Sequence, residues 1–231
     1  MTECLAIIAA GGSGQRMGGN VPKQFMEING KPIIAHTIET FENSLHIKCI
    51  IVVAPEEYIN VVWRIVKCYS YEKVIAVIAG GRTRQESVYN ALLFAEASMP
   101  GKVLVHDAAR PFVELNDIEA IVKGVDEAGC AVPVVSVKDT IKVLDEMGEV
   151  STLDRASIYA VQTPQGFNFK LLLESHKKAI TDGFEGYDDS VLTERMGLKT
   201  KLINSGYHNM KITTKEDLWL AEKLLLQKKE R

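Results

Sequence analysis

The stretch CLAIIAAGGSGQRMGGNVPK, residues 4–23, decides the fold of this chain. Its apolar run at 5–10 predicts a buried strand, because the run is short, continuous and bounded by turn residues. The run leads directly into residues 11–14, whose glycines let the backbone turn sharply and let its N–H groups approach an anion. Arg16 and Lys23 add positive charge, so the stretch has the features that hold a nucleoside triphosphate.

The glycine spacing matches neither of two common phosphate-binding motifs. Gly12, Gly14 and Gly18 do not form the dinucleotide pattern G-x-G-x-x-G, and no Gly-Lys-Ser/Thr closes the loop as in a Walker A motif. Glycine-rich turns also follow strands in many proteins without a nucleotide. Taken alone, this loop is also consistent with an ordinary tight turn that binds no nucleotide. The later motifs decide between the two interpretations.

Size and charge indicate one large α/β domain. A chain of 231 residues, 46% hydrophobic and 25% charged, can bury a substantial core. The formal charge of −3, with dispersed Lys and Arg, argues against a nucleic-acid or membrane-binding surface. Cys4, Cys49, Cys68 and Cys130 lie far apart, which predicts free thiols. Neither a signal peptide nor a run of membrane-spanning length is present, so we expect a cytoplasmic protein.

Strands and helices alternate along most of the chain, which indicates a mostly parallel sheet with helices on both faces. The expected strands are 5–10, 47–54, 74–78, 103–106, 130–137, 158–162, 200–203 and 210–213. The expected helices begin near Lys31, Pro55, Gln85, Asn116, Asn168 and Lys215.

The alternation is interrupted after Val137. Residues 139–143 and 149–153 have the pattern of two short strands around a turn at 145–148. An isolated two-stranded hairpin is marginally stable in water, so it either forms its own domain or is held by a second subunit. Because the alternating pattern resumes afterwards, we favour the second subunit.

Polar and glycine-rich segments follow several of these strands, where parallel sheets bind their ligands. The segment GGRTRQES at 80–87 can direct Arg84 and Ser87 toward a base or phosphate; a turn with a capping Ser or Thr is the alternative. Thr163 and Lys211 follow later strands. Asp188 and Asp189 could bind a cation, but we favour a helix N-terminus, where the helix dipole stabilises acidic residues.

Asp107 follows the strand at 103–106 and would be a desolvated charge unless a cation meets it. Mg²⁺ takes one or two carboxylates and completes its shell with phosphate oxygens and water, so Asp107 is a candidate magnesium ligand. A simple ion pair with Arg110 is the competing interpretation. His106 is interpreted as a structural residue rather than a base.

Together the motifs resemble those of the 2-C-methyl-D-erythritol 4-phosphate cytidylyltransferase family, from the first strand to the last helix. The segments that carry the resemblance are AAGGSGQRMG with PKQF, GGRTRQESV, VLVHDAARPF, DTIK, Arg155, QTPQGF and NMKITTKEDL.

The resemblance implies a single Rossmann-like α/β nucleotidyltransferase domain, of the nucleotide-diphospho-sugar transferase type. It also implies a homodimer formed through a projecting β-arm at about 139–160. The substrate phosphate would attack the α-phosphorus of CTP in the presence of Mg²⁺, releasing pyrophosphate and leaving a CDP-linked methylerythritol.

The resemblance further implies roles for individual residues. Those that would hold the triphosphate are Ala10, Gly11, Gly12, Gly14, Arg16 and Lys23. Those that would line the cytidine side are Gly81, Arg84 and Ser87. Asp107 would serve the metal and the polyol phosphate, with Arg110 nearby. Those that would grip the substrate phosphate are Thr163 and Lys211, with Thr140 and Arg155 from the partner's arm. The catalytic residues would be Arg16, Lys23, Arg155 and Lys211.

Elementary charge considerations agree with these roles. CTP and a phosphomonoester bring about six negative charges together, so cations must neutralise them before attack. A phosphomonoester is already ionised at neutral pH, so the reaction needs no general base.

The chain departs from the family pattern at Ser136, Tyr187 and Arg82, which affects the base pocket and the arm rather than the reaction. Two alternatives remain open: a ribitol-5-phosphate cytidylyltransferase and an inactive nucleotide-binding scaffold. The pair Ala108 and Ala109 and the GGRTRQESV stretch favour the methylerythritol substrate over ribitol phosphate. The presence of the expected cations argues against the scaffold.

Overall fold

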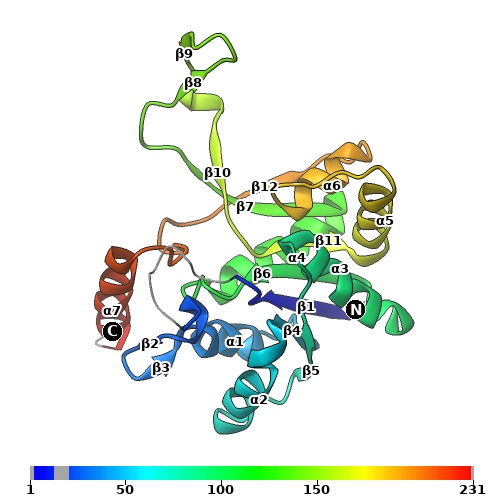
Figure 1. Cartoon of the computed structure of the whole chain (residues 1–231), viewed down its shortest axis with the longest axis vertical. Helices are drawn as coiled ribbons and strands as arrows, with labels where there is room; N and C mark the ends of the chain where they lie inside the picture. The colour runs from blue at the N-terminus through cyan, green and yellow to red at the C-terminus, as the bar shows by residue number, and fades with distance from the viewer. Residues whose placement is uncertain (1–2, 13–20, 230–231) are drawn as a thin grey trace.

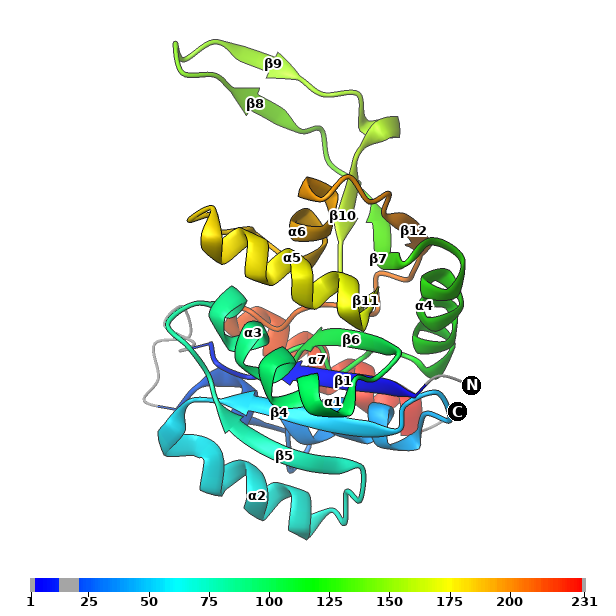
Figure 2. The same cartoon turned by 90° about the vertical axis from the view of Figure 1, so that its right-hand side faces the viewer.

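An eight-stranded mixed sheet runs through the middle of the molecule (Figures 1 and 2). The computed structural model describes residues 3–12 and 21–229. The strand order is β10–β7–β11–β6–β1–β4–β5, with β12 paired to β7. These strands are β1 (Cys4–Ala9), β4 (Cys49–Ala54), β5 (Val74–Ala79), β6 (Lys102–Asp107), β7 (Cys130–Ser136), β10 (Tyr159–Val161), β11 (Gln165–Asn168) and β12 (Lys201–Asn204).

The first strand, β1, lies at the centre of the parallel part of the sheet. It pairs in parallel with β4 on one side and with β6 on the other, so that Ile7 lies opposite Ile51 and Val105. Ala6 and Ile8 pack into the core on one face, whereas Leu5 and Ile7 pack into the core on the other. Burial on both faces explains why the run is continuously apolar rather than alternating.

Helices cover both faces of this sheet. The helices that pack on the face of Ala6 and Ile8 are α1 (Ile33–Asn43), α2 (Ile59–Cys68) and α4 (Leu115–Ala128). Those on the opposite face are α3 (Arg84–Ala95) and α5 (Phe169–Thr181), and α6 (Asp189–Arg195) contacts α5. Short 3₁₀ turns are η2 (Lys23–Phe25), η3 (Glu56–Tyr58), η4 (Glu96–Ser98) and η5 (Arg155–Ser157). The expected mostly parallel α/β sheet with two covered faces is confirmed.

Strand β11 is an element that the sequence pattern does not reveal. Its first residue belongs to the segment Thr163-Pro164-Gln165, which has the composition of a polar turn. In the structure β11 runs antiparallel between β6 and β7 and makes the sheet mixed. Gly166 is essential here, because a Cβ at this position would lie 2.5 Å from Cγ2 of Ile121 and 2.8 Å from Cγ2 of Val125 on α4.

The expected strand at 210–213 is wrong. Met210 and Ile212 alternate with polar residues, and this alternation requires only an extended chain, not a neighbouring strand. The segment runs beside the turn after β6, where the amide of Ile212 donates to the carbonyl of Ala109 at 2.9 Å. The amide of Met210 donates to the carbonyl of His208 at 2.7 Å and closes a tight turn. Within the part of the chain that the structure describes, no ladder of backbone hydrogen bonds forms along the segment.

A smaller apolar cluster joins the C-terminal helix to an early hairpin. The hairpin strands are β2 (Glu27–Ile28) and β3 (Lys31–Pro32), and the helix is α7 (Lys215–Lys229) (Figure 1). Ile28, Ile212 and Ala221 are buried together in this cluster. The cluster places the segment before α7, including Lys211, against the body of the sheet.

The arm expected at about 139–160 projects from the body (Figure 2). Its tip consists of β8 (Lys142–Leu144) and β9 (Val150–Thr152), which are shorter than expected and, among the strands of the described residues, pair only with each other. All residues of both strands are exposed. Apolar side chains are among them, with Leu144 68% and Val150 64% exposed.

Two further expectations concern the thiols and membranes. Cys4, Cys49, Cys68 and Cys130 are free, as expected. Within residues 3–12 and 21–229, every helix is too short or too polar to span a bilayer.

We expect Gly166→Ala to lower the free energy of unfolding by about 1–3 kcal/mol, because the new methyl group would push α4 away from β11. Urea denaturation followed by circular dichroism measures this change. Leu45→Ala, at a side chain that is 99% exposed, should change it by less than about 0.5 kcal/mol. A Gly166→Ala protein as stable as the parent would contradict the close packing.

Candidate functional site

The carboxyl ends of β1, β5 and β6 meet at a cavity of about 590 Å³. Its walls come from the loop after β1, from η2, from the start of α3, from the turn after β6 and from the segment before α7. The lining residues are Ala9, Ala10, Gly11, Gly12, Lys23, Gln24, Gly81, Arg82, Thr83, Arg84, Ser87, Asp107, Ala108, Ala109, Lys211 and Thr213.

Most of the residues expected in a site are therefore brought together. Thr163 and Arg110 are not among the lining residues but contact Asp107. Thr163 accepts a hydrogen bond from the backbone amide of Asp107, and Arg110 forms an ion pair with the carboxylate. Gly14 and Arg16 lie outside the described residues. Thr140 and Arg155 lie at the arm and do not line the cavity of their own chain; Arg155 donates from Nη1 to the carbonyl of Lys138 at 2.9 Å.

Asp107 is the centre of a group of cations. Its Oδ2 lies 2.7 Å from Nζ of Lys211 and 3.8 Å from Nε of Arg110, and its Oδ1 lies 3.4 Å from Nε of Arg84. Burial by itself raises the pKa of this carboxyl, but the charges of Arg84 and Lys211 outweigh that effect and hold the pKa well below its usual range. The ion pair with Arg110 that the sequence left open exists, but it is the longest of the set.

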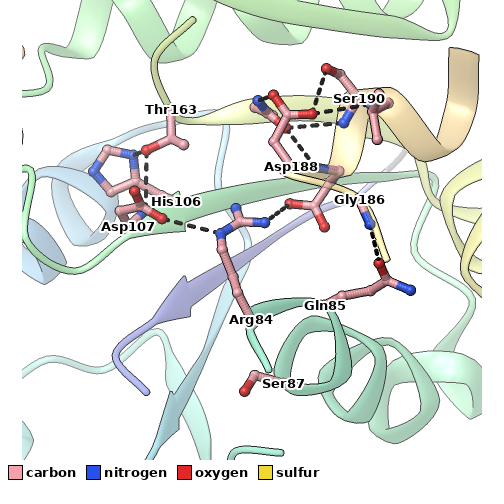
Figure 3. Close-up of polar contacts among 12 residues, drawn as sticks. Arg84, Gln85, Ser87, His106, Asp107, Thr163, Gly186, Asp188 and Ser190 are labelled. Carbon is pink, nitrogen blue, oxygen red and sulfur yellow. Dashed lines mark hydrogen bonds and ion pairs between the residues drawn. The ribbon is translucent and has the colours of Figure 1, made fainter. Parts of the chain in front are cut away.

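Arg84 connects this cluster to a buried carboxylate. Its Nη1 lies 2.6 Å from Oδ2 of Asp189, and Oδ1 of Asp189 lies 3.2 Å from Nε2 of the buried His176. Burial lowers the pKa of Arg84, but Asp189 and Asp107 raise it by more, so its guanidinium keeps its charge. Figure 3 shows Arg84 pointing from α3 toward Asp107.

Asp188 and Asp189 form the start of α6, as the favoured interpretation expected. Oδ1 of Asp188 accepts from the amide of Val191 at 3.1 Å, and its Oδ2 accepts from Nε2 of Gln165 at 2.7 Å. The cap therefore satisfies the helix N-terminus and orients Asp189 toward Arg84. The contact between Asp189 and Arg84 spans 105 positions, and the sequence pattern carried no signal for it.

His106 is completely buried and hydrogen-bonded at both ring nitrogens. Nε2 lies 3.0 Å from the carbonyl oxygen of Arg110, which can only accept, so we assign the ring proton to Nε2. Nδ1 then accepts from the hydroxyl of Thr163 at 3.0 Å, while Thr163 Oγ1 accepts from the amide of Asp107 at 3.1 Å (Figure 3). Burial lowers the pKa of His106 to about 4. His106 and Thr163 together therefore fix the backbone of Asp107. The hydroxyl proton of Thr163 is directed to His106.

Asn209 completes this support and was missed from the sequence. It is fully buried; its side-chain Nδ2 donates to the backbone carbonyl of Thr163 at 2.8 Å, and its backbone carbonyl accepts from Nη1 of Arg110 at 2.8 Å. A buried polar side chain is costly unless it is hydrogen-bonded, which explains why Asn209 contacts Thr163. The signal available in the sequence was its position two residues before the candidate Lys211.

The capping interpretation of the segment at 80–87 is confirmed, and Arg84 and Ser87 of the same segment line the cavity. Thr83 caps α3 by accepting from the amide of Glu86 at 3.1 Å. Ser87 Oγ donates to the carbonyl of Thr83 at 2.8 Å and accepts from the amide of Gly81 at 3.0 Å. Its proton is therefore used within the loop, and Ser87 can offer only an acceptor to a ligand. Arg82 points to the surface, where its Nε lies 3.4 Å from Oε2 of Glu86.

The residues of the cavity can hold Mg²⁺ only if the phosphates of the nucleotide supply most of its ligands. The described residues hold no group of three or more His, Cys, Asp or Glu placed to ligate a metal. Asp107 is the only carboxylate among the described residues that line the cavity, and cations contact both of its oxygens. Mg²⁺ bound to phosphates needs only one protein carboxylate, and the half-exposed Lys211 could give up its contact to provide it.

Comparisons with known proteins agree on one family. The family model of 2-C-methyl-D-erythritol 4-phosphate cytidylyltransferase matches residues 4–227. A protein of that name from Bacillus mycoides (strain KBAB4) is 44% identical over 224 residues, which covers 96% of this chain and 98% of the relative. The crystal structure of 4-diphosphocytidyl-2C-methyl-D-erythritol synthase from Anaerococcus prevotii DSM 20548 is similar with a TM-score of 0.87 and 30% identity, covering 97% of this chain and 96% of that one. The 2-C-methyl-D-erythritol 4-phosphate cytidylyltransferase of Thermus thermophilus gives a TM-score of 0.75 and 32% identity, covering 97% of this chain and 99% of that one.

We expect His106→Gln to make stability less dependent on pH. The pKa of His106 is about 4 in the folded protein against an ordinary 6.5, so between these values only the unfolded chain takes up the proton. The parent should therefore lose roughly 3 kcal/mol of unfolding free energy as the pH falls across this interval. A glutamine cannot titrate, and its amide can still donate to the carbonyl of Arg110.

Urea unfolding of both proteins at pH 7, 6 and 5 measures this difference. The carboxylates of the fold contribute equally to both curves, so only the difference between the curves reports on His106. Parallel curves would contradict a neutral, buried imidazole.

Proposed function

Because the chain belongs to the 2-C-methyl-D-erythritol 4-phosphate cytidylyltransferase family, we propose that it transfers CMP from CTP to 2-C-methyl-D-erythritol 4-phosphate. The products are 4-CDP-2-C-methyl-D-erythritol and pyrophosphate, on the non-mevalonate route to isoprenoid precursors. The observation that carries the proposal is the cavity itself, which has a glycine-rich loop with Lys23 on its wall and the cationic cluster of Asp107 beside it. Such a cavity suits two phosphorylated reactants.

In the reaction, an oxygen of the substrate phosphate forms a bond to the α-phosphorus of CTP. The bond from the α-phosphorus to the oxygen that bridges to the β-phosphorus breaks, and its electron pair leaves with pyrophosphate. No proton has to be moved, because the attacking phosphate is already ionised. The protein therefore acts by positioning the reactants and by neutralising charge that grows in the transition state.

On the nucleotide side, the backbone of residues 10–12 and the ammonium of Lys23 would bind the triphosphate, together with Gly14 and Arg16. Gly81, Arg84 and Ser87 would line the cytidine side. Ser87 would act as an acceptor, since its proton is donated to Thr83. Hydrogen-bond donors that are in place before the substrate binds need no reorganisation during the reaction. Backbone N–H groups held in position would therefore stabilise the transition state effectively.

On the acceptor side, Lys211 would exchange its contact with Asp107 for the substrate phosphate. Its side chain is 39% exposed, so it can turn toward a ligand, whereas that of Arg110 is only 13% exposed. We assign to Thr163 the support of Asp107 from behind. Asp107 would be the protein ligand of the Mg²⁺ that accompanies CTP, and the ion would supply positive charge against the phosphates.

The arm would complete the site of a second copy of the chain. Three observations on residues 3–12 and 21–229 support a homodimer: β8 and β9 pair only with each other, their apolar side chains are exposed, and Thr140 and Arg155 are absent from the lining of their own cavity. In a symmetric dimer each arm can reach the partner's cavity, where Thr140 and Arg155 would hold the substrate phosphate.

We place the protein in the cytoplasm, without a nucleic-acid or membrane partner. CTP and a phosphorylated polyol are highly charged and do not cross membranes by themselves, so the enzyme has to act where they are made. The four free cysteines agree with a reducing compartment.

A pyrophosphate-release assay with two substrates tests the reaction. With CTP and Mg²⁺, we expect kcat/KM for 2-C-methyl-D-erythritol 4-phosphate to exceed that for ribitol 5-phosphate by about tenfold or more, since the cavity has to match the polyol. Preference for ribitol 5-phosphate would replace the proposed substrate. Binding of CTP without turnover of either phosphate would identify a nucleotide-binding scaffold instead.

Complementation between two inactive variants tests the shared site. In a heterodimer of Arg155→Ala and Lys211→Ala subunits, an arm that acts on the partner leaves one of the two sites intact. Random mixing should therefore restore about one quarter of the parent activity at low substrate concentration.

The matched control mixes Lys211→Ala with Lys23→Ala subunits, which both carry their change in the body. Every site then keeps one defect, so no activity should return. Failure of the Arg155→Ala mixture to recover, or full activity in a monomer, would contradict the role of the arm.

A further inference from the structure

We propose that Gln24 is a positioning residue that sets residues 10–12, where the glycine-rich loop begins, and Lys23 in the arrangement that receives the triphosphate. The inference rests on the proposed function only in that it names the triphosphate as the group received. Gln24 belongs to the PKQF segment that carries the family resemblance, but its residue type and position alone predict no role, because a glutamine after a lysine is ordinary on a protein surface.

Gln24 is unusually buried for its type. It is 2% exposed, although it stands in the short η2 turn at the wall of the cavity. Its Nε2 donates to the carbonyl of Ala10 at 2.5 Å and to the carbonyl of Gly12 at 3.0 Å. A primary amide has two N–H donors, so each of them is used on one carbonyl of the loop.

These two hydrogen bonds determine the direction in which the loop presents its polar groups. A trans peptide is planar, so when the carbonyl of Ala10 faces Gln24 the N–H of Gly11 points the opposite way. The amide of Ala10 donates to the carbonyl of Val53 at 2.7 Å, which fixes the other side of this residue. Gln24 therefore binds the carbonyls of Ala10 and Gly12, which would repel a phosphate, and leaves the N–H of Gly11 to meet it.

The same turn carries Lys23. The amide of Phe25 donates to the carbonyl of Pro22 at 2.9 Å, and the amide of Met26 donates to that of Lys23 at 3.0 Å. The ring of Phe25 stacks on Tyr58, with centroids 4.5 Å apart and planes 7° apart, which ties the turn to η3. Because Lys23 and Gln24 are consecutive in a turn held at both ends, the hydrogen bonds of Gln24 also fix the distance between Lys23 and the loop.

The test compares binding of CTP with binding of CMP, which lacks the β- and γ-phosphates. Isothermal titration measures both nucleotides on the parent and on Gln24→Met, which keeps the volume and removes both donors. We expect the affinity for CTP to fall by about tenfold or more and that for CMP by less than about threefold, because only the outer phosphates lose their ordered amides. In the assay, kcat should fall while KM for the polyol phosphate stays within about twofold.

Gln24→Glu provides a second variant of the same shape. Its carboxylate faces two carbonyl oxygens and the phosphates, so the loss of CTP affinity should exceed that of Gln24→Met. The matched control is Gln85→Met, whose parent side chain also makes two backbone contacts, with the carbonyl of Phe184 and the amide of Gly186, away from the cavity. This control should leave both affinities within about twofold.

Three results would overturn the inference: unchanged CTP affinity in both variants, equal losses for CTP and CMP, or a Gln85→Met protein with the same selective loss. Thermal melting identifies a variant that does not fold, and the other variant then carries the test. If the parent binds CTP but does not turn over 2-C-methyl-D-erythritol 4-phosphate, the proposed function fails, while the CTP-to-CMP comparison still decides the role of Gln24.

Discussion

The site depends on one buried carboxylate that holds several cations near each other. Arg84, Arg110 and Lys211 come from three separate parts of the chain and would repel one another at the distances observed. Asp107 offsets that repulsion before any ligand is present, so the protein can fold with its positive charges already gathered. In the proposed reaction an incoming phosphate would compete with Asp107 for Lys211, the most exposed of the three. The same ion pairs thus contribute to stability and prepare the site.

Asp107 can hold these cations in place only if its own backbone is fixed by neighbouring groups. His106 and Thr163 hold the backbone of Asp107, while Asp189 holds Arg84 from the other side. None of these groups has to touch a reactant. They matter because a transition state with growing charge is stabilised most by donors and cations that do not move during the reaction. The rigidity of the sheet is passed to the cavity through these buried hydrogen bonds.

The arm differs from the cavity, because buried contacts within its own chain do not hold it in place. It has no core of its own, and Leu144 and Met147 are exposed at 68% and 90%. Such a segment is stabilised only by something that packs against it, and a second copy of the chain has the symmetry to do so reciprocally. Requiring a partner for the last contacts to the substrate would couple assembly to activity.

The sequence by itself determined the strands, the helices and the loop segments that end in the cavity, because burial on both faces of a parallel sheet and turn residues leave local patterns. It also determined the family, through motifs such as VLVHDAARPF. It failed at 210–213, where an extended chain imitated a strand, and at β11, whose polar first residues resembled a turn. Tertiary structure alone decided the contacts of Asp189 with Arg84, of Asn209 with Thr163 and of Gln24 with Ala10. Each joins residues far apart in the chain through a single polar atom, and a lone buried hydrogen bond leaves no periodicity in the sequence.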